Sequence, residues 1–159
     1  PFDFTFHDEM NHVAKIMCKE LAGSVLAYVQ SDEISVLLTD FYSEQTEALF
    51  DGNLQKICSI AASIATASFN ELQWIKSTVD KKPKLAHFDA RVFTIPDVNM
   101  VVKYFQWRQM DATRNSIQMA ARSLYSHNEL EGKNIREMKA MMLTKDINWN
   151  DYPVEYVVA

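Results

Sequence analysis

The sequence predicts an α+β domain with few strands, a small antiparallel sheet packed with helices. Apolar residues recur at helical spacing over residues 8–22, 54–76 and 97–126. Two short apolar runs, residues 25–29 and 34–38, flank a polar joint, and the alternating run "HFDARVFTI" ends at Pro96. The predicted order is therefore helix, two strands, helix, strand and long helix, which is a thin but feasible sheet of three strands.

The first predicted helix places Met10, Val13 and Met17 on one face, and Gly23 is its expected C-terminal stop. Residues 25–29 and 34–38 are predicted to be the buried arms of a hairpin. The following polar stretch "TDFYSEQTEALFDGN" has no predicted structure. From Leu54 to about Lys76 the helical pattern returns, and the alanines at 61, 62, 65 and 67 would allow close packing of helices.

The second half of the chain begins with a basic loop, "STVDKKPKLA", which holds Lys81, Lys82 and Lys84. Residues 87–95 are predicted to form the third strand. Asp97 is placed to cap the long helix that follows. An amphipathic helix, "IREMKAMMLTK", and the loop "DINWNDYP" complete the pattern.

Composition limits the function classes. The 159 residues favour a single domain, residues 1–159, in which a C-terminal helical extension follows the sheet. A net charge of -5 argues against a broadly basic nucleic-acid binder. The chain has no apolar run of about 18 residues, and its start lacks the features of a secretory signal. Two cysteines in apolar helical contexts favour free thiols, and together these features predict a cytoplasmic protein that does not span a membrane.

The joint "SDE" places Asp32 and Glu33 between the two apolar arms. Ser and Asp are common turn residues, so one interpretation is a simple turn. Glu is not a turn former, however, and short hairpins usually use Asn-Gly or Asp-Gly. The alternative is that the carboxylates hold Mg²⁺ for phosphoryl or nucleotidyl transfer.

The helix that begins at Leu54 carries Lys56, Ser59 and Ser63 at i, i+3 and i+7, on one face. A lysine beside hydroxyl groups can receive a triphosphate. The alternative is a solvated helix face with small polar residues.

The segment "WRQMDATRNS" also has a polar face, because Arg108, Asp111 and Asn115 follow i, i+3 and i+7, with Arg114 displaced around the helix. Arg and Asn bind phosphates or base edges, whereas an Arg–Asp pair three residues apart can be only a helix ion pair. In "FDARVF", Asp89 and Arg91 share the face of the predicted strand opposite Phe88, Ala90 and Val92.

Six segments in this order resemble the tRNA-His guanylyltransferase family: "YVQSDEISVLLTDF", "FDGNLQKICSIAASIATASFN", "FDARVFTIP", "WRQMDATRNSI", "YSHNELEGK" and "INWNDYP". They are most similar to its bacterial-type members, the guanylyltransferase-like 3′–5′ RNA polymerases. The resemblance implies a palm like that of polymerases and nucleotide cyclases. It also implies template-dependent addition of nucleotides to the 5′ end of tRNA, with two Mg²⁺ ions and with ATP and GTP as substrates.

The resemblance implies roles for the residues at matching positions. Asp32 matches a metal-binding aspartate, and Glu33 supports the metal site. Asp3, Ser31, Lys56 and Ser59 match positions near the nucleotide. The positions that match tRNA contacts are Arg108, Asp111, Arg114, Asn115, Asn148 and Asn150. The family also implies a homotetramer built as a dimer of dimers.

The sequence departs from the family pattern at three places. Residues 112–116, "ATRNS", replace the His-Ile-Asn-Asn motif of eukaryotic members, which argues for repair of 5′-truncated tRNAs rather than dedicated tRNA-His recognition. The family's first strand, whose Asp-Gly-Lys/Arg motif holds the other metal aspartate, is missing, and "VEYVVA" replaces a basic C-terminal segment. We therefore expect a chain that is incomplete at both ends.

Two alternatives to the enzyme remain. One is a non-catalytic nucleotide- or RNA-binding remnant of the palm. The other is a signalling module of the nucleotide-cyclase or diguanylate-cyclase type, which is disfavoured because no "GGDEF"-like segment is present.

Overall fold

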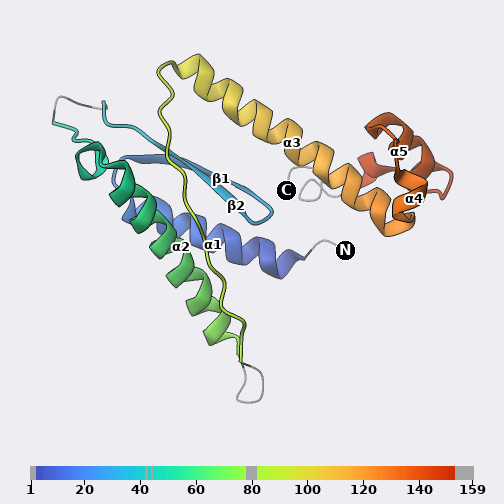
Figure 1. Cartoon of the computed structure of the whole chain (residues 1–159), viewed down its shortest axis with the longest axis horizontal. Coiled ribbons are helices and arrows are strands. Elements are labelled where there is room, and N and C mark those ends of the chain that lie inside the picture. Colours follow the sequence, from blue (N-terminus) through green and yellow to red (C-terminus); the bar gives the residue numbers. More distant parts are fainter. Residues whose placement is uncertain (1–2, 42, 44, 78–81, 153–159) are drawn as a thin grey trace. The chain divides into compact units, whose positions relative to one another are not determined.

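The structure, a computed structural model, describes residues 3–41, 43, 45–77 and 82–152. They form two compact units (Figure 1). The N-terminal unit spans Phe4–Thr94, and the C-terminal unit comprises Asp3 and the described residues from Ile95 onward. Helices and a small antiparallel sheet are both present, so the α+β prediction is confirmed.

The N-terminal unit begins with helix α1 (Phe4–Glu20), which starts four residues before the predicted helix. A hairpin follows, made of β1 (Ser24–Gln30) and β2 (Glu33–Leu38). The hairpin prediction is thus confirmed, but the burial prediction is wrong in part, since Val25 is 59% exposed. Partly buried β1 and β2 side chains, such as Val29 and Val36, pack against the core, whereas Val25 remains exposed to solvent.

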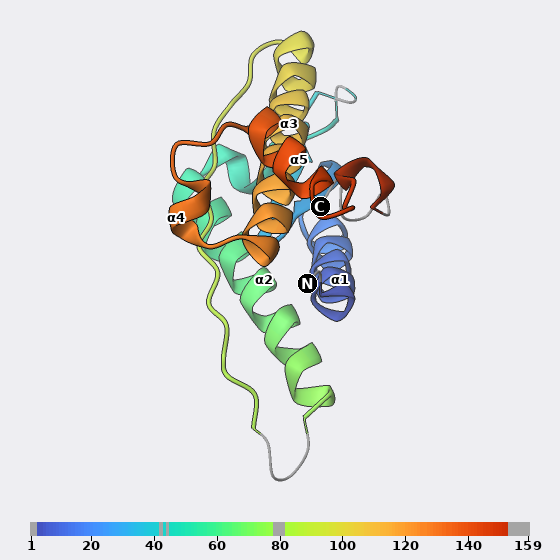
Figure 2. The same ribbon diagram turned by 90° about the vertical axis from the view of Figure 1, so that its right-hand side faces the viewer.

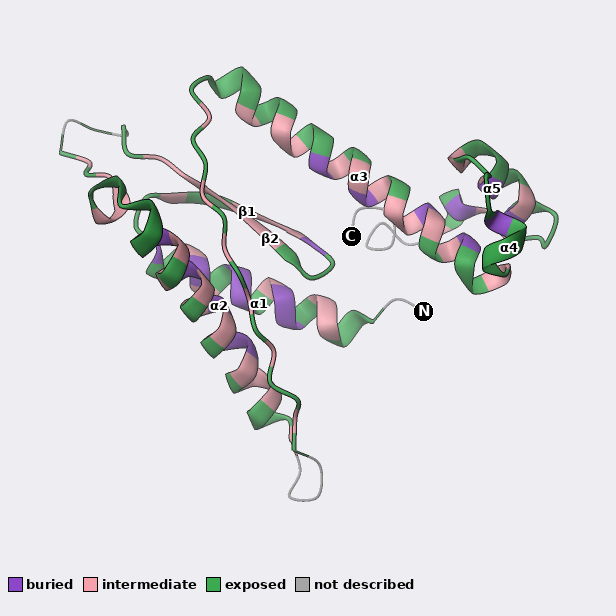
Figure 3. Ribbon diagram, in the orientation of Figure 1, coloured by how far each residue is buried: buried purple, intermediate pink, exposed green. Residues whose placement is uncertain are grey.

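Helix α2 (Leu54–Ile75) lies against α1 and forms the core of this unit with it. The buried side chains are Met10, Val13, Met17 and Leu21 from the α1 side and Ala61, Ala65 and Phe69 from α2. Figure 3 shows these buried positions along both helices. Of the four alanines predicted to allow close packing of helices, Ala61 and Ala65 are buried, Ala62 is half-buried and Ala67 is exposed.

A buried carboxylate also joins the two helices. Glu9 on α1 is only 7% exposed and accepts hydrogen bonds from Gln73 Nε2 at 2.7 Å and Lys76 Nζ at 2.9 Å. A buried carboxylate is tolerated when it is paired and hydrogen-bonded in this way. The contact fixes α1 against the last turn of α2.

The predicted third strand, residues 87–95, is wrong as secondary structure. Residues 87–92 alternate between exposed and half-buried, and 93 and 94 are both exposed, yet the structure assigns no strand to this segment. Among the described residues, the sheet consists of β1 and β2 alone. The alternating pattern predicts the direction of the side chains, but a strand also requires backbone hydrogen bonds with a neighbouring strand.

Side chains of α2 hold this extended segment instead. The Asn70 side chain donates to the Ala86 carbonyl oxygen at 2.9 Å and accepts from the Ala86 N–H at 2.8 Å. The Phe88 N–H donates to Thr66 Oγ1 at 3.1 Å, and the Phe88 ring contacts Phe69 edge-on. Residues 86–90 therefore lie along α2.

The C-terminal unit is helical. It contains α3 (Val98–Leu124), α4 (His127–Leu130), α5 (Ile135–Leu143) and the short 3₁₀ helix η2 (Trp149–Asp151). Figure 2 shows α4 and α5 beside the end of α3. The Asp97 side chain accepts from the Asn99 N–H, which confirms the predicted cap of α3. The core of the unit consists of Ile117, Ala121, Leu130, Met138, Met142 and Trp149.

The short helix α4 is closed by a capping box. The Ser126 hydroxyl and backbone N–H donate to the Glu129 carboxylate at 2.7 and 2.8 Å. These hydrogen bonds hold the pKa of Glu129 below its usual value.

Within the described residues, no helix is long and apolar enough to cross a membrane. Residues 78–81 of the predicted basic loop, Lys81 among them, lie outside the described residues.

Gly23 should be sensitive to substitution for two reasons. Its φ is +82°, and an added Cβ would lie 2.6 Å from the Thr39 carbonyl oxygen. We expect Gly23→Ala to lower the free energy of unfolding by about 3 kcal/mol, measured by urea titration. Gly52, with φ +71° and no atom within 4 Å of an added Cβ, is the matched control. Gly52→Ala should cost about 1 kcal/mol, and equal losses would show that the contact with Thr39 is unimportant.

Candidate active site

The hairpin turn displays two carboxylates at the end of the sheet. Gln30 pairs with Glu33, so Ser31 and Asp32 form a two-residue connection. Ser31 has φ +53°, a left-handed conformation that glycine usually adopts at this point of a hairpin. Gln30 is buried, whereas Ser31, Asp32 and Glu33 are exposed. The turn therefore presents its acidic groups to solvent and contributes little to the core.

The donor chemistry of this turn fits Mg²⁺. Two carboxylates and a hydroxyl are hard oxygen donors, and Mg²⁺ in proteins is commonly bound by one or two carboxylates with waters and substrate phosphates. Within the described residues, no group of three or more His, Cys, Asp or Glu side chains could enclose a metal ion. The turn thus fits an open site that the substrate completes.

The start of α2 is a second polar position. It is preceded by three successive left-handed residues, Phe50, Asp51 and Gly52, with φ of +51°, +52° and +71°. Asn53 then caps the helix by accepting from the Lys56 N–H at 3.1 Å. The Lys56 ammonium lies 4.6 Å from the centroid of the Phe50 ring. This cation–π contact holds the ammonium beside the first turn of α2.

The predicted face of α2 is exposed, but its hydroxyls are engaged within the helix. Ser59 Oγ donates to the Lys56 carbonyl oxygen at 3.1 Å, and Ser63 Oγ donates to the Ser59 carbonyl oxygen at 2.7 Å. Lys56 is thus the one residue of these three that carries a charge. In Figure 1 the hairpin turn and the start of α2 lie at opposite ends of the hairpin. The structure does not bring Asp32 and Lys56 together.

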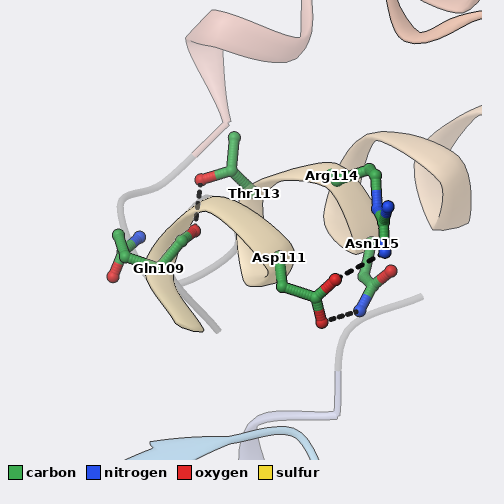
Figure 4. A network of polar contacts seen from close by, with 5 residues as sticks. All are labelled: Gln109, Asp111, Thr113, Arg114 and Asn115. Carbon is green, nitrogen blue, oxygen red and sulfur yellow. Dashed lines mark hydrogen bonds and ion pairs between the residues drawn. The ribbon is translucent and has the colours of Figure 1, made fainter. Parts of the chain in front are cut away.

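On α3, one carboxylate organises the polar motif (Figure 4). Asp111 accepts from Arg114 at 2.6 Å and from Asn115 Nδ2 at 3.1 Å. The sequence suggested that Arg108 would pair with Asp111 and that Arg114 would lie apart. In the structure Arg114 contacts Asp111 and so does not lie apart, and the Arg114 side chain remains 59% exposed.

Arg108 occupies a different environment from Arg114. It is only 8% exposed, and its guanidinium carbon lies 5.6 Å from the centroid of the Trp107 ring. Asp3 is exposed and belongs to the same C-terminal unit.

The block "INWND" contains two asparagines with different roles. The Asn148 side chain caps η2, because it accepts from the Asn150 N–H at 3.2 Å and donates to Asp151 Oδ1 at 3.2 Å. Asn150 is exposed, and its Oδ1 accepts from Lys139 Nζ at 3.4 Å. Trp149 between them is buried and donates to Ser116 Oγ at 3.1 Å, which ties η2 to α3.

Sequence reasoning missed several residues that position these groups. The Asn70 clamp on Ala86 gave no signal, since one asparagine in a helix is ordinary. The contact of the Phe50 ring with Lys56 was also not indicated by the sequence, although the "DGN" that follows Phe50 is a turn signature. Lys139, which lies 4.0 Å above the Trp149 ring, could have been found only from the tertiary contact.

The two asparagines allow a test that separates structure from function. Asn148→Ala should lower the free energy of unfolding of the C-terminal unit by about 1 kcal/mol, because η2 loses its cap. Asn150→Ala should change it by less than about 0.5 kcal/mol, because the side chain is exposed. Thermal unfolding followed by circular dichroism would measure both, and a larger loss for Asn150→Ala would contradict these assignments.

Known proteins are similar to this chain in sequence. The family model described as "Thg1: tRNAHis guanylyltransferase" matches residues 1–96. The tRNA(His) guanylyltransferase of Schizosaccharomyces pombe is 31% identical over 117 residues, which cover 74% of this chain and 42% of that protein. The probable tRNA(His) guanylyltransferase of Dictyostelium discoideum is 28% identical over 159 residues, covering 92% and 60%. The chain therefore spans only part of the length of these relatives.

Solved structures are also similar. A bacterial tRNA(His) guanylyltransferase (Thg1)-like protein in complex with ATP superposes with a TM-score of 0.92 at 42% identity, covering 99% of this chain and 68% of that one. A bacterial Thg1-like protein in complex with GTP gives a TM-score of 0.82 at 37% identity, covering 99% and 63%. Sequence and fold lead to the same conclusion: this chain belongs to the tRNA-His guanylyltransferase family.

Proposed function

We propose that this chain is the catalytic part of a Mg²⁺-dependent nucleotidyltransferase that adds nucleotides to the 5′ end of tRNA. Base pairing with the opposite strand of the tRNA selects each added nucleotide, and the addition repairs truncated 5′ ends. The observation that carries the proposal is the exposed carboxylate pair at the hairpin turn of a chain in this family. Both acidic side chains are exposed to solvent.

The reaction needs positioning and charge neutralisation rather than a protein nucleophile. The 5′-monophosphate first attacks the α-phosphorus of ATP or GTP and releases pyrophosphate. The 3′-hydroxyl of the incoming nucleotide then attacks the activated 5′-phosphorus of the tRNA and releases AMP or GMP. Asp32 and Glu33 are the residues that would hold the metal, and bound Mg²⁺ would neutralise charge on the reacting phosphates. Ser31 adds a neutral oxygen beside them.

Lys56 is proposed to hold a nucleotide phosphate through its ammonium, with Ser59 on the same face. Relatives bound to ATP and to GTP support a nucleotide site in this family. Because the hairpin turn and the start of α2 lie at opposite ends of the hairpin (Figure 1), Lys56 and Asp32 are assigned to different groups of the bound substrates. Asp3 is proposed to lie near a nucleotide triphosphate.

The tRNA side of the site is proposed to include α3 and the block after α5. Arg114 is the strongest candidate, since its guanidinium is exposed while Asp111 holds it in place. Asn115, Arg108 and Asn150 are further candidates, and Asn148 contributes by shaping η2.

A homotetramer built from two dimers is also proposed. Support comes from the large apolar side chains that the first half of α3 exposes, among them Met100, Trp107 and Met110. An association of subunits would cover such a face.

A second candidate is a non-catalytic nucleotide- or RNA-binding protein. The observation in its favour is that the described residues contain no group of three or more His, Cys, Asp or Glu side chains that could hold a metal ion. Such a protein would bind tRNA or nucleotide without extending the RNA.

The deciding experiment uses the full-length gene product with Mg²⁺, ATP and all four nucleotides. The substrate is a 5′-monophosphorylated tRNA that lacks its first nucleotide, and products are resolved at single-nucleotide length. Addition of the one nucleotide that restores pairing is expected. No extension, even of a 5′-triphosphorylated tRNA that bypasses activation, would favour the binding protein.

Asp32→Ala should abolish nucleotide addition, with a loss of at least about 100-fold in rate, while the free energy of unfolding changes by less than about 1 kcal/mol. The reason is that Asp32 is exposed and outside the core. Asp40→Ala removes another exposed carboxylate of the same unit and serves as the control. Retained activity, or unfolding of the Asp32 variant, would disprove the metal assignment.

A further inference from the structure

The end of α2 distant from Lys56 carries an exposed surface of a different character. Trp74 and Ile75, in the last turn of the helix, are 51% and 73% exposed. Lys82 and Lys84 are exposed on the extended segment that follows, and Leu85 is 58% exposed. This part of the surface thus combines two exposed lysines with large exposed hydrophobic side chains.

The clamp on Ala86 places the lysines beside this helix end. Residue 86 lies level with Asn70, and residue 88 lies level with Thr66. Two extended residues advance about 6.6 Å and four helical residues about 6 Å, in opposite chain directions. Continuing this spacing by one step brings Lys84 level with the turn of α2 that contains Trp74.

The charge at this surface is uncompensated within the described residues. Lys76 at the end of α2 is already paired with the buried carboxylate of Glu9. No ion pair or hydrogen bond of Lys82 or Lys84 with a described residue is present, and they belong to a chain whose net charge is -5. A local cationic surface on an acidic protein fits an anionic partner.

The distance between Lys56 and this surface indicates how large a single ligand that contacts both would have to be. Trp74 lies 18 positions after Lys56 on α2, which is about 27 Å along the helix axis. A nucleoside triphosphate held at Lys56 would therefore not reach the lysines, whereas an RNA duplex or strand would. Aromatic side chains beside lysines are typical of surfaces on which bases stack while cations contact the phosphates.

We propose that Trp74, Lys82 and Lys84, here called the α2-end surface, contact the backbone and a base of the RNA substrate away from the reacting 5′ end. This inference rests on the proposed function, in which the substrate is tRNA. It assigns the lysines to phosphates and Trp74 to a stacked base.

The test measures tRNA affinity of the full-length gene product at several salt concentrations. Lys82→Gln/Lys84→Gln is compared with Lys15→Gln/Lys19→Gln, which removes two exposed lysines of α1. For the α2-end variant we expect about tenfold weaker binding. Its slope of log affinity against log salt should be smaller by about 1.4 to 1.8, and the control should be unchanged. GTP affinity should be the same in all three proteins.

Trp74 is tested separately. Trp74→Ala should weaken tRNA binding, Trp74→Phe should restore most of it, and circular dichroism should show all variants folded. Equal slopes for both lysine pairs would overturn the α2-end surface. So would equal binding of polyglutamate and tRNA, which would indicate a general polyanion site. If the wild-type protein binds no tRNA, the proposed function itself fails; if it binds tRNA and the α2-end variants bind equally well, only this inference fails.

Discussion

The packing of α1 against α2 is the interaction on which the N-terminal unit depends. A two-stranded hairpin is marginally stable in water by itself, so β1 and β2 need a support. Met10, Val13 and Met17 of α1 provide it, and they are completed by Ala61 and Ala65, whose small side chains let the helices approach closely. The hairpin turn with Asp32 and Glu33 can remain outside this core because the core is already closed beneath it.

The same helix pair determines where the other candidate groups lie. Lys56 belongs to the first turn of α2 and Trp74 of the α2-end surface to its last turn, so the length of the helix sets their separation. The ion pair between Lys76 and the buried Glu9 fixes the C-terminal end of α2 to α1. An enzyme that binds both a nucleotide and an RNA benefits from such a helix, because it keeps a constant distance between Lys56 and the α2-end surface.

Much of the fold could be predicted because it follows from local patterns. The helices, the Asp97 cap and the hairpin are specified by periodicity, capping residues and turn chemistry within short segments. The third strand could not be decided in this way. Residues 86–92 have the alternation of a strand, but pairing depends on whether a second backbone lies beside them, which side-chain period does not reveal.

The candidate site was predictable to a similar extent. Residue types and their order located the turn carboxylates, Lys56 and the α3 motif, since these are contiguous features. The contact between Arg114 and Asp111 was not predictable, because it depends on the direction of the Arg114 side chain and not on its spacing along the helix. The separation of the hairpin turn from Lys56 is likewise a tertiary property that no spacing in the sequence encodes.

The Asn70 clamp has a consequence for how the extended segment is specified. A sheet strand is aligned by many backbone hydrogen bonds, whereas here the Asn70 amide binds both the N–H and the carbonyl oxygen of one residue, Ala86, and Thr66 accepts from the Phe88 N–H. A slip of one residue would turn Asp89 and Arg91 toward the core and Phe88 toward water. The side chains of Asn70 and Thr66 therefore set the register of the segment along α2.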